Sequence, residues 1–188
     1  IGEAMLERGY SVDKLHELAP RVAGSPDDRG AQLEAVMIQL NYDHRFAESL
    51  AVGEEYLAHL KAHGAPPAQV INTYASLGRT LFQLGRLDES EAMRRAGVAW
   101  APDAHDHDTE QKRILLAADL GGLLTNRGKR EVALGALKQA DDLAVRYSGS
   151  DHLRFEPLLR LGMFHLGFDD ALALQELQQA RQELQAYG

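Results

Sequence analysis

Apolar residues recur with helical spacing along most of the chain. Between residues 70 and 84 they stand at Val70, Tyr74, Leu77, Leu81 and Leu84, separated alternately by steps of four and three. Such steps place side chains on one face of an α-helix. No segment shows the strict alternation of apolar and polar residues that marks a half-buried strand. The pattern therefore predicts an all-α fold.

Prolines and glycines mark the ends of the expected helices. Pro66 and Pro67 stand where a helix start tolerates proline, and Gly85 stands where that helix should end. The expected helices are 2–9, 12–22, 27–42, 45–63, 68–84, 87–101, 109–127, 130–147, 152–166 and 169–186. Because Pro20 interrupts the first pair, the N-terminal segment is expected to be a cap or a truncated repeat.

The expected helices repeat along the sequence. Residues 70–102 align with residues 113–145 at an offset of 43 residues, so that Leu77-Gly78 falls on Leu120-Gly121 and Gly85 falls on Gly128. A fainter copy lies 41 residues upstream, where Leu33, Val36, Leu40, Phe46 and Ser49 match Tyr74, Leu77, Leu81, Leu87 and Ser90. A fourth copy lies in residues 155–174. Repetition of this kind predicts a stack of helix pairs.

Small residues recur at equivalent places in these copies. They are Gly78, Ser90 and Gly97 in one copy and Gly121, Ala133 and Ala140 in the next. Glycine inside a helix costs up to about 1 kcal/mol relative to alanine, so its recurrence needs a packing reason. Close approach of paired helices, with the larger leucines filling the space between them, provides that reason.

The segment LGRTLFQLGRLDES, residues 77–90, with Pro102 closing the unit, resembles the tetratricopeptide repeat (TPR). The resemblance covers roughly residues 30–186. It implies a TPR-like α-solenoid, in which about four to five antiparallel helix pairs stack as a right-handed superhelix around a concave groove. The chain departs from the family at Met37, Tyr56 and Glu91, and its period of 41–43 residues exceeds the usual 34.

The repeats divide the chain into five expected segments within one domain. These are the N-terminal cap or truncated repeat 1–26, a degenerate repeat 27–66, the repeats 67–107 and 108–150, and the segment 151–188. The last segment combines a degenerate repeat with a C-terminal capping helix. Leu172, Leu174, Leu177 and Leu184 are expected to form a seam along that helix, which serves either as a cap or as a dimer contact.

Composition excludes several classes of function. Acidic residues outnumber basic ones by 28 to 20, for a formal net charge of −8, so direct nucleic-acid binding is not expected. No apolar run reaches the roughly 18 residues that would predict membrane insertion. The absence of cysteine excludes disulfides and thiolate chemistry and favours a cytoplasmic location. Because the chain begins with Ile1 instead of methionine, we expect it to be a piece of a longer protein.

Two short segments invite a chemical interpretation. PDAHDHD, residues 102–108, carries metal-ligand side chains, but it lies between two helix pairs, where few ligands converge. We expect a connecting loop without a metal, with Asp108 as the N-cap of the next helix. GGLLTNRGKR, residues 121–130, has neither the glycine spacing nor the Ser or Thr of a phosphate-binding loop. With no catalytic motif and no cofactor expected, the segment is predicted not to be an enzyme.

The resemblance to the TPR family implies a set of ligand-facing residues on the first helix of each pair. These positions are Glu34, Ile38, Asn41 and Tyr42, then Asn72, Arg79, Phe82 and Gln83, then Ala118, Gly122, Thr125 and Asn126. Amides and a guanidinium bind a peptide backbone and its end groups, and aromatic rings offer apolar contact. The alternative interpretation is that these side chains are only solvated or lie between helices.

The sequence thus predicts a non-catalytic module that binds a protein, a peptide or another domain of its own chain. Its Ala-, Leu- and Arg-rich usage and long repeat favour the sensory or regulatory part of a bacterial signalling protein. One alternative is a regulatory segment fused to an enzyme, such as a diguanylate cyclase, or to a DNA-binding transcription activator. Another is a structural scaffold that oligomerises, for example as a homodimer.

Overall fold

The computed structural model describes residues 26–147 and 153–185, and every regular element in that part is an α-helix. The helices are α3 (Pro26–Tyr42), α4 (Phe46–Ala62), α5 (Pro67–Gln83), α6 (Leu87–Val98), α7 (His107–Asn126), α8 (Arg130–Tyr147), α9 (Phe155–His165) and α10 (Asp170–Gln185). Their bounds agree with the expected helices to within three residues, so the all-α prediction is confirmed. The helices expected at 2–9 and 12–22 lie outside the described residues.

Helix α6 is shorter than predicted. It ends at Val98, whereas the sequence pattern placed its end at residue 101. Ala101 has a φ of +47°, which is incompatible with a right-handed helix. The chain therefore leaves α6 early and forms a longer connection to α7 than the sequence suggested.

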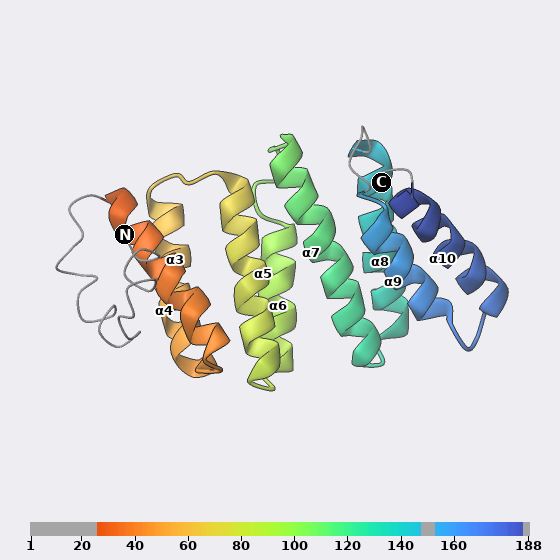
Figure 1. Ribbon diagram of the computed structural model, residues 1–188, viewed down its shortest axis with the longest axis horizontal. Coiled ribbons are helices and arrows are strands. Elements are labelled where there is room, and N and C mark those ends of the chain that lie inside the picture. The colour runs from red at the N-terminus through yellow and green to blue at the C-terminus, as the bar shows by residue number, and fades with distance from the viewer. Residues whose placement is uncertain (1–25, 148–152, 186–188) are drawn as a thin grey trace. The chain divides into compact units, whose positions relative to one another are not determined.

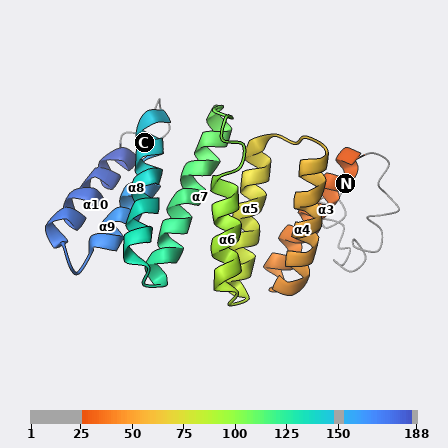
Figure 2. The same cartoon turned by 180° about the vertical axis from the view of Figure 1, so that it is seen from behind.

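The chain forms two compact units, Ile1–Met93 and Arg94–Gly188, with the division falling inside α6. In unit 1, α4 packs against both α3 and α5. In unit 2, α7 packs against α8, α9 packs against both, and α10 packs against α9. Figure 1 shows α9 in front of α8, and Figure 2, seen from behind, shows α8 in front of α9. Each unit is thus built from antiparallel helix pairs in two layers.

The predicted apolar stripe of α5 forms part of the core of unit 1. Val70, Tyr74, Leu77 and Leu81 are all buried. In unit 2, a core cluster joins α7, α8 and α9 through Leu120, Leu124, Ala133, Ala136, Leu137, Leu161 and Phe164. The helical spacing of apolar residues therefore identified core positions in both units.

Glycine allows the close helix approach that its recurrence indicated. A methyl group added to Gly121 of α7 would lie 2.4 Å from Cδ2 of Leu137 on α8. In the first helix pair the sizes are exchanged: Met37 occupies the place equivalent to Gly121, and Gly53 the place equivalent to Leu137. A methyl group at Gly53 would lie 2.9 Å from Sδ of Met37. The departure from the family at Met37 is therefore accommodated by a glycine on the facing helix.

Two serines at equivalent positions make the same hydrogen bond. Ser49 Oγ donates to the carbonyl of Met37 at 3.0 Å, and Ser90 Oγ donates to the carbonyl of Gly78 at 2.6 Å. Both serines are fully buried, so these bonds satisfy a hydroxyl inside the helix pair. The next repeat has Ala133 at this position, which leaves no hydroxyl to satisfy.

The turns inside the helix pairs use left-handed backbone. Gly85 and Gly128, which the sequence placed at helix ends, have φ values of +73° and +70°. His44 stands at the equivalent position of the first pair, 41 residues before Gly85, with a φ of +58°. Glycine adopts this conformation without a steric penalty, whereas the side chain of His44 makes the same conformation sterically unfavourable.

The expected leucine seam of α10 packs against α9 only in part, with Leu177 lying next to Gly162. Leu174 and Leu184, which the sequence analysis assigned to a leucine seam, are exposed. The buried residues of α10 are Ala173, Glu176 and Ala180, because α9 approaches closely at Gly162. The Nδ1 atom of buried His165 on α9 lies 2.7 Å from Oε2 of Glu176. Small side chains and this polar pair, and not the leucines alone, therefore hold α10 against α9.

Candidate functional site

The predicted ligand-facing residues of α5 all lie at the surface of unit 1. Asn72, Arg79 and Gln83 are exposed, and Phe82 keeps 40% of its surface accessible. They occupy the side of α5 away from the buried stripe of Tyr74 and Leu77. The helix therefore presents an amide, a guanidinium and an aromatic ring to solvent.

The predicted residues of α3 divide into exposed and internal ones. Tyr42 and Ile38 are exposed, at 79% and 46%, and Glu34 is half-buried. The Asn41 amide donates to Ser49 Oγ at 2.7 Å and to the Met37 carbonyl at 3.2 Å, and its Oδ1 accepts from Thr80 Oγ1 at 3.0 Å. Asn41 thus links α3, α4 and α5 inside unit 1, as the inter-helix alternative described.

The predicted residues of α7 contribute little exposed surface. Ala118 is fully buried, and Thr125 returns its hydroxyl to the carbonyl of Gly121 at 2.9 Å. A methyl group at Gly122 would lie 2.7 Å from a guanidinium nitrogen of Arg160 on α9, so that position is occupied by a neighbouring helix. Asn126 is exposed at the end of α7. The exposed candidates are therefore concentrated on α3 and α5.

The loop PDAHDHD caps α7, but through a different aspartate from the one predicted. Asp106 is the N-cap, and its carboxylate accepts a hydrogen bond from the Thr109 backbone N–H at 3.0 Å. Asp108, the predicted cap, lies within the first turn of α7, which begins at His107. Hydrogen bonding from Thr109 lowers the pKa of the Asp106 carboxyl, since it favours the charged form.

A buried arginine holds the connection between α6 and α7. Arg113 of α7 donates to the carbonyls of Trp100, Ala101 and Ala104, at 3.2, 2.8 and 3.2 Å. Its guanidinium also donates to Oε1 of buried Glu110 at 2.5 Å. A guanidinium has the forked donors needed for so many acceptors. Arg113 therefore helps to fix the path of residues 99–106, together with the turn closed by the hydrogen bond from Ala104 N–H to the Ala101 carbonyl.

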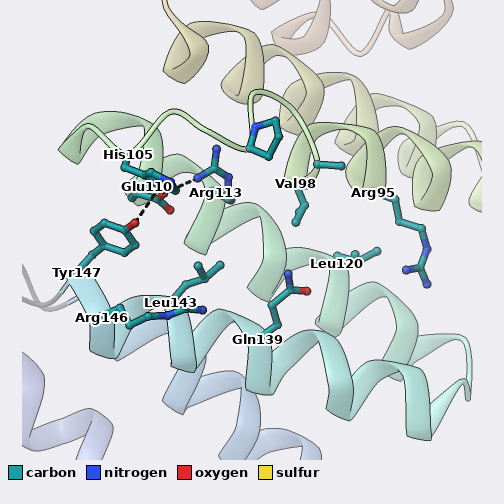
Figure 3. A pocket seen from close by; sticks show the side chains of 12 residues that line it. Arg95, Val98, His105, Glu110, Arg113, Leu120, Gln139, Leu143, Arg146 and Tyr147 are labelled. Atoms are coloured by element: carbon teal, nitrogen blue, oxygen red, sulfur yellow. Dashed lines mark hydrogen bonds and ion pairs between the residues drawn. The ribbon is translucent and has the colours of Figure 1, made fainter.

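A cavity of about 410 Å³ lies beside this connection, within unit 2. Its apolar lining includes Val98, Leu120 and Leu143, and its polar lining includes Arg95, His105, Glu110, Arg113, Gln139, Arg146 and Tyr147. Figure 3 shows Val98, Leu143 and Gln139 between Arg95 at one end and the His105–Tyr147 pair at the other. We refer to it as the α7–α8 cavity.

A hydrogen-bonded cluster forms one end of the cavity. His105 Nδ1 lies 2.8 Å from Glu110 Oε1 and 3.0 Å from the hydroxyl of Tyr147 (Figure 3). Glu110 is 1% exposed, and its second oxygen, Oε2, has no hydrogen-bond partner among the described residues. Partial burial, together with the nearby Glu110 carboxylate, raises the pKa of Tyr147. Oε1 of Glu110 therefore contacts both His105 and the guanidinium of Arg113, which neutralises the charge of the carboxylate.

Metal-ligand and membrane-spanning features are absent from the part of the chain that the structure describes. Within residues 26–147 and 153–185, no group of three or more His, Asp or Glu side chains is arranged to hold a metal ion. His105 of the PDAHDHD segment instead points its ring nitrogen at Glu110. In the same residues, no helix combines the length and apolar character needed to cross a bilayer.

Sequence reasoning missed the α7–α8 cavity because it treated charged residues as solvated by default. None of the twelve ligand-facing positions that the resemblance implies lines the cavity. A signal was nevertheless present: Glu110 and Arg113 stand in register with the apolar stripe of Ile114 and Ala117, which is the buried face of α7. A charged pair three residues apart on a core-facing stripe indicates a buried ion pair.

Neither a family profile nor a curated protein sequence matches the chain. Among solved structures, a single-substitution variant of a putative kinesin light chain from Podosopora anserina with nearly identical TPR-like repeats has 16% sequence identity and a TM-score of 0.71. The match covers 92% of this chain and 84% of the kinesin light chain structure. Another structure of such a kinesin light chain has 16% identity and a TM-score of 0.63, with coverage of 94% and 83%.

BtubC (BKLC) from P. vanneervenii is a further similar structure. It shares 18% sequence identity with this chain at a TM-score of 0.68, and the match covers 98% of this chain and 71% of BtubC. At these identities the likeness concerns the fold. Together with the paired helices, the left-handed turns and the small residues between helices, it establishes that this chain has the fold of the TPR-like repeat proteins.

Proposed function

We propose that this chain is a non-catalytic binding module that takes up an extended segment of a partner protein, or of another domain of its own chain. The observation that carries the proposal is the group of exposed apolar side chains on α3 and α5. Tyr42, Ile38 and Phe82 are large, apolar and accessible, and α5 also presents the hydrogen-bonding groups of Asn72 and Arg79. We refer to these five residues as the α3–α5 surface. Peptide-binding surfaces combine aromatic anchors with a few polar groups in this way.

The packing of unit 1 supports a common surface for these residues. The hydrogen bond from Thr80 to Asn41 joins the C-terminal halves of α3 and α5 at 3.0 Å. Tyr42 follows Asn41 directly, and Phe82 stands two residues after Thr80, so both rings project from the same end of unit 1. Rings held on packed helices lose little conformational freedom when a ligand binds.

The wider setting of the module is part of the same proposal. TPR-like folds commonly serve in protein interactions through extended surfaces built from successive repeats. We infer that this module regulates a larger, cytoplasmic bacterial signalling protein, in which occupation of the α3–α5 surface alters the activity of an attached output domain. The regulated output domain would then be a fused enzyme or a DNA-binding transcription activator.

Peptide selection followed by matched substitutions tests the proposal. Peptides selected from a random display library on the immobilised chain are expected to lose at least about tenfold in affinity for Asn72→Ala/Arg79→Ala and for Tyr42→Ala/Phe82→Ala. The control is Glu54→Ala, an exposed position on α4 outside the predicted set. Fluorescence anisotropy measures the affinities, and circular dichroism checks the fold. If the selected peptides bind all variants equally, the α3–α5 surface is not the binding site.

A further inference from the structure

We propose that the α7–α8 cavity is a second binding site, which takes a small organic carboxylate with an apolar body. All its lining residues lie between Arg95 and Tyr147, within unit 2, so the site is separate from the α3–α5 surface. Its volume of about 410 Å³ lies within the range of about 300–1,000 Å³ that is typical of small-molecule pockets.

The charges around the cavity favour an anion. Arg113 and Glu110 neutralise each other, and the Arg113 guanidinium also donates hydrogen bonds to backbone carbonyls of the α6–α7 connection. The lining contains three arginines, Arg95, Arg113 and Arg146, and one carboxylate, that of Glu110. This excess of basic over acidic side chains in the lining contrasts with the chain as a whole, whose formal net charge is −8.

Arg146 is placed to bind a carboxylate. Its Nε donates to the backbone carbonyl of Asp142 at 3.2 Å, which orients the guanidinium along α8. Its two terminal nitrogens donate to none of the residues that the structure describes. A guanidinium fork binds a carboxylate through two parallel hydrogen bonds, an arrangement that a lysine cannot reproduce.

The remaining lining favours a ligand with an apolar body. Gln139, Leu143 and Arg146 stand at intervals of four and three residues, so one face of α8 presents an amide, an apolar group and a cation in succession. Val98 and Leu120 supply further apolar lining (Figure 3). An inorganic anion would leave this apolar surface uncovered, whereas an uncharged apolar ligand would bury the guanidinium without a partner.

Calorimetric titration of the full chain with three probes tests the ligand class. Phenylpropionate combines a carboxylate with an aromatic body, phenylpropanol removes the charge, and inorganic phosphate removes the body. We expect saturable binding of phenylpropionate with a dissociation constant on the order of 1 mM or lower, and at least about tenfold weaker binding of the other two. Equal binding of phenylpropanol or phosphate, or no saturation by phenylpropionate at about 10 mM, would overturn the proposal.

Substitutions on α8 locate the binding. Arg146→Gln is expected to weaken phenylpropionate binding at least about tenfold, because the carboxylate loses its charged partner. The control Lys138→Gln removes the same charge from an exposed position of α8 that does not line the cavity, and should leave the affinity unchanged. Gln139→Phe should fill the cavity and abolish binding, with helicity checked by circular dichroism. Equal affinities for the Arg146 and Lys138 variants would place the ligand elsewhere and refute the site.

Discussion

Gly121 and Gly135 lie on the two facing helices of one pair in unit 2, and their surroundings are opposite. Gly121 is buried against Leu137, whereas Gly135 is exposed with no atom within 4 Å of an added methyl group. Both residues carry the same helix-propensity cost relative to alanine. Any difference between their alanine variants therefore measures the contact between α7 and α8 and not the intrinsic preference for helix.

We predict that Gly121→Ala lowers the free energy of unfolding by about 1–3 kcal/mol, because the added methyl group would lie 2.4 Å from Cδ2 of Leu137. Gly135→Ala should raise it by about 0.5–1 kcal/mol, through better helix propensity and a less flexible unfolded chain. Chemical denaturation of the two variants measures both values. A stabilising effect of alanine at position 121 would contradict the close approach of the helices.

The second prediction at this scale concerns the acid stability of the α7 cap. The pKa of Asp106 is lowered in the folded chain by hydrogen bonding from Thr109. A lowered pKa contributes stability above the ordinary pKa of the carboxyl, and this contribution is lost as the pH falls through the folded-state value. In Asp106→Asn, which keeps a capping oxygen without a titrating group, the melting temperature should therefore fall less between pH 7 and about pH 3.

Asp108→Asn is the matched control for the cap, because Asp108 lies in the same loop segment but inside the first turn of α7. Thermal melts followed by circular dichroism give the pH dependence of each variant. We expect the Asp108 variant to retain the steeper acid dependence of the unaltered chain. An equal flattening in both variants would show that general loss of negative charge, and not the cap, is responsible.

At the scale of elements, Arg113 connects α7 to the preceding turn. We predict that Arg113→Met lowers the free energy of unfolding by about 3–5 kcal/mol, because it leaves the Glu110 carboxylate buried without its cation and removes the partner of three carbonyls. The double variant Glu110→Gln/Arg113→Met should lose less, since no buried charge remains. Urea denaturation distinguishes the two. A loss below about 1 kcal/mol for Arg113→Met would refute this role.

The helices themselves could be predicted because their signals are local. Gly85 and Gly128 mark turns that need left-handed backbone, and the apolar spacing of α5 follows directly from helical geometry. The exchange of sizes between Met37 and Gly53 could not be predicted in the same way. It depends on which residues of two helices face each other, and that pairing is set by tertiary packing and not by the spacing within either helix.

The candidate surfaces were predicted only in part, for a similar reason. The family pattern indicates which side of a helix lies away from its partner, and Tyr42 and Phe82 are indeed exposed. It does not indicate that Asn41 is engaged by Ser49 and Thr80. The α7–α8 cavity requires residues from three separate segments to converge, which no single periodic pattern describes.

At the scale of the whole molecule, stability is distributed along the chain. The described core of unit 2 gathers residues of α7, α8 and α9, and unit 1 is built around α4 and its contacts with α3 and α5. In repeat proteins each helix pair is stabilised mainly by its neighbours, so the effect of a substitution declines with distance along the sequence. The two sites proposed above lie in different units, and variants designed for one should leave the other available for measurement.

The connection held by Arg113 also bears on how such a chain can diverge. Residues 99–106 derive much of their shape from donors on α7, in addition to the turn that the hydrogen bond from Ala104 N–H to the Ala101 carbonyl closes. Insertions or exchanges at the exposed residues of this segment therefore leave the helix registers on either side unchanged. At such a place the repeat period can increase from 41 to 43 residues without a change in the packed helices. Substitutions there can also bring new side chains, such as His105, into the lining of the cavity.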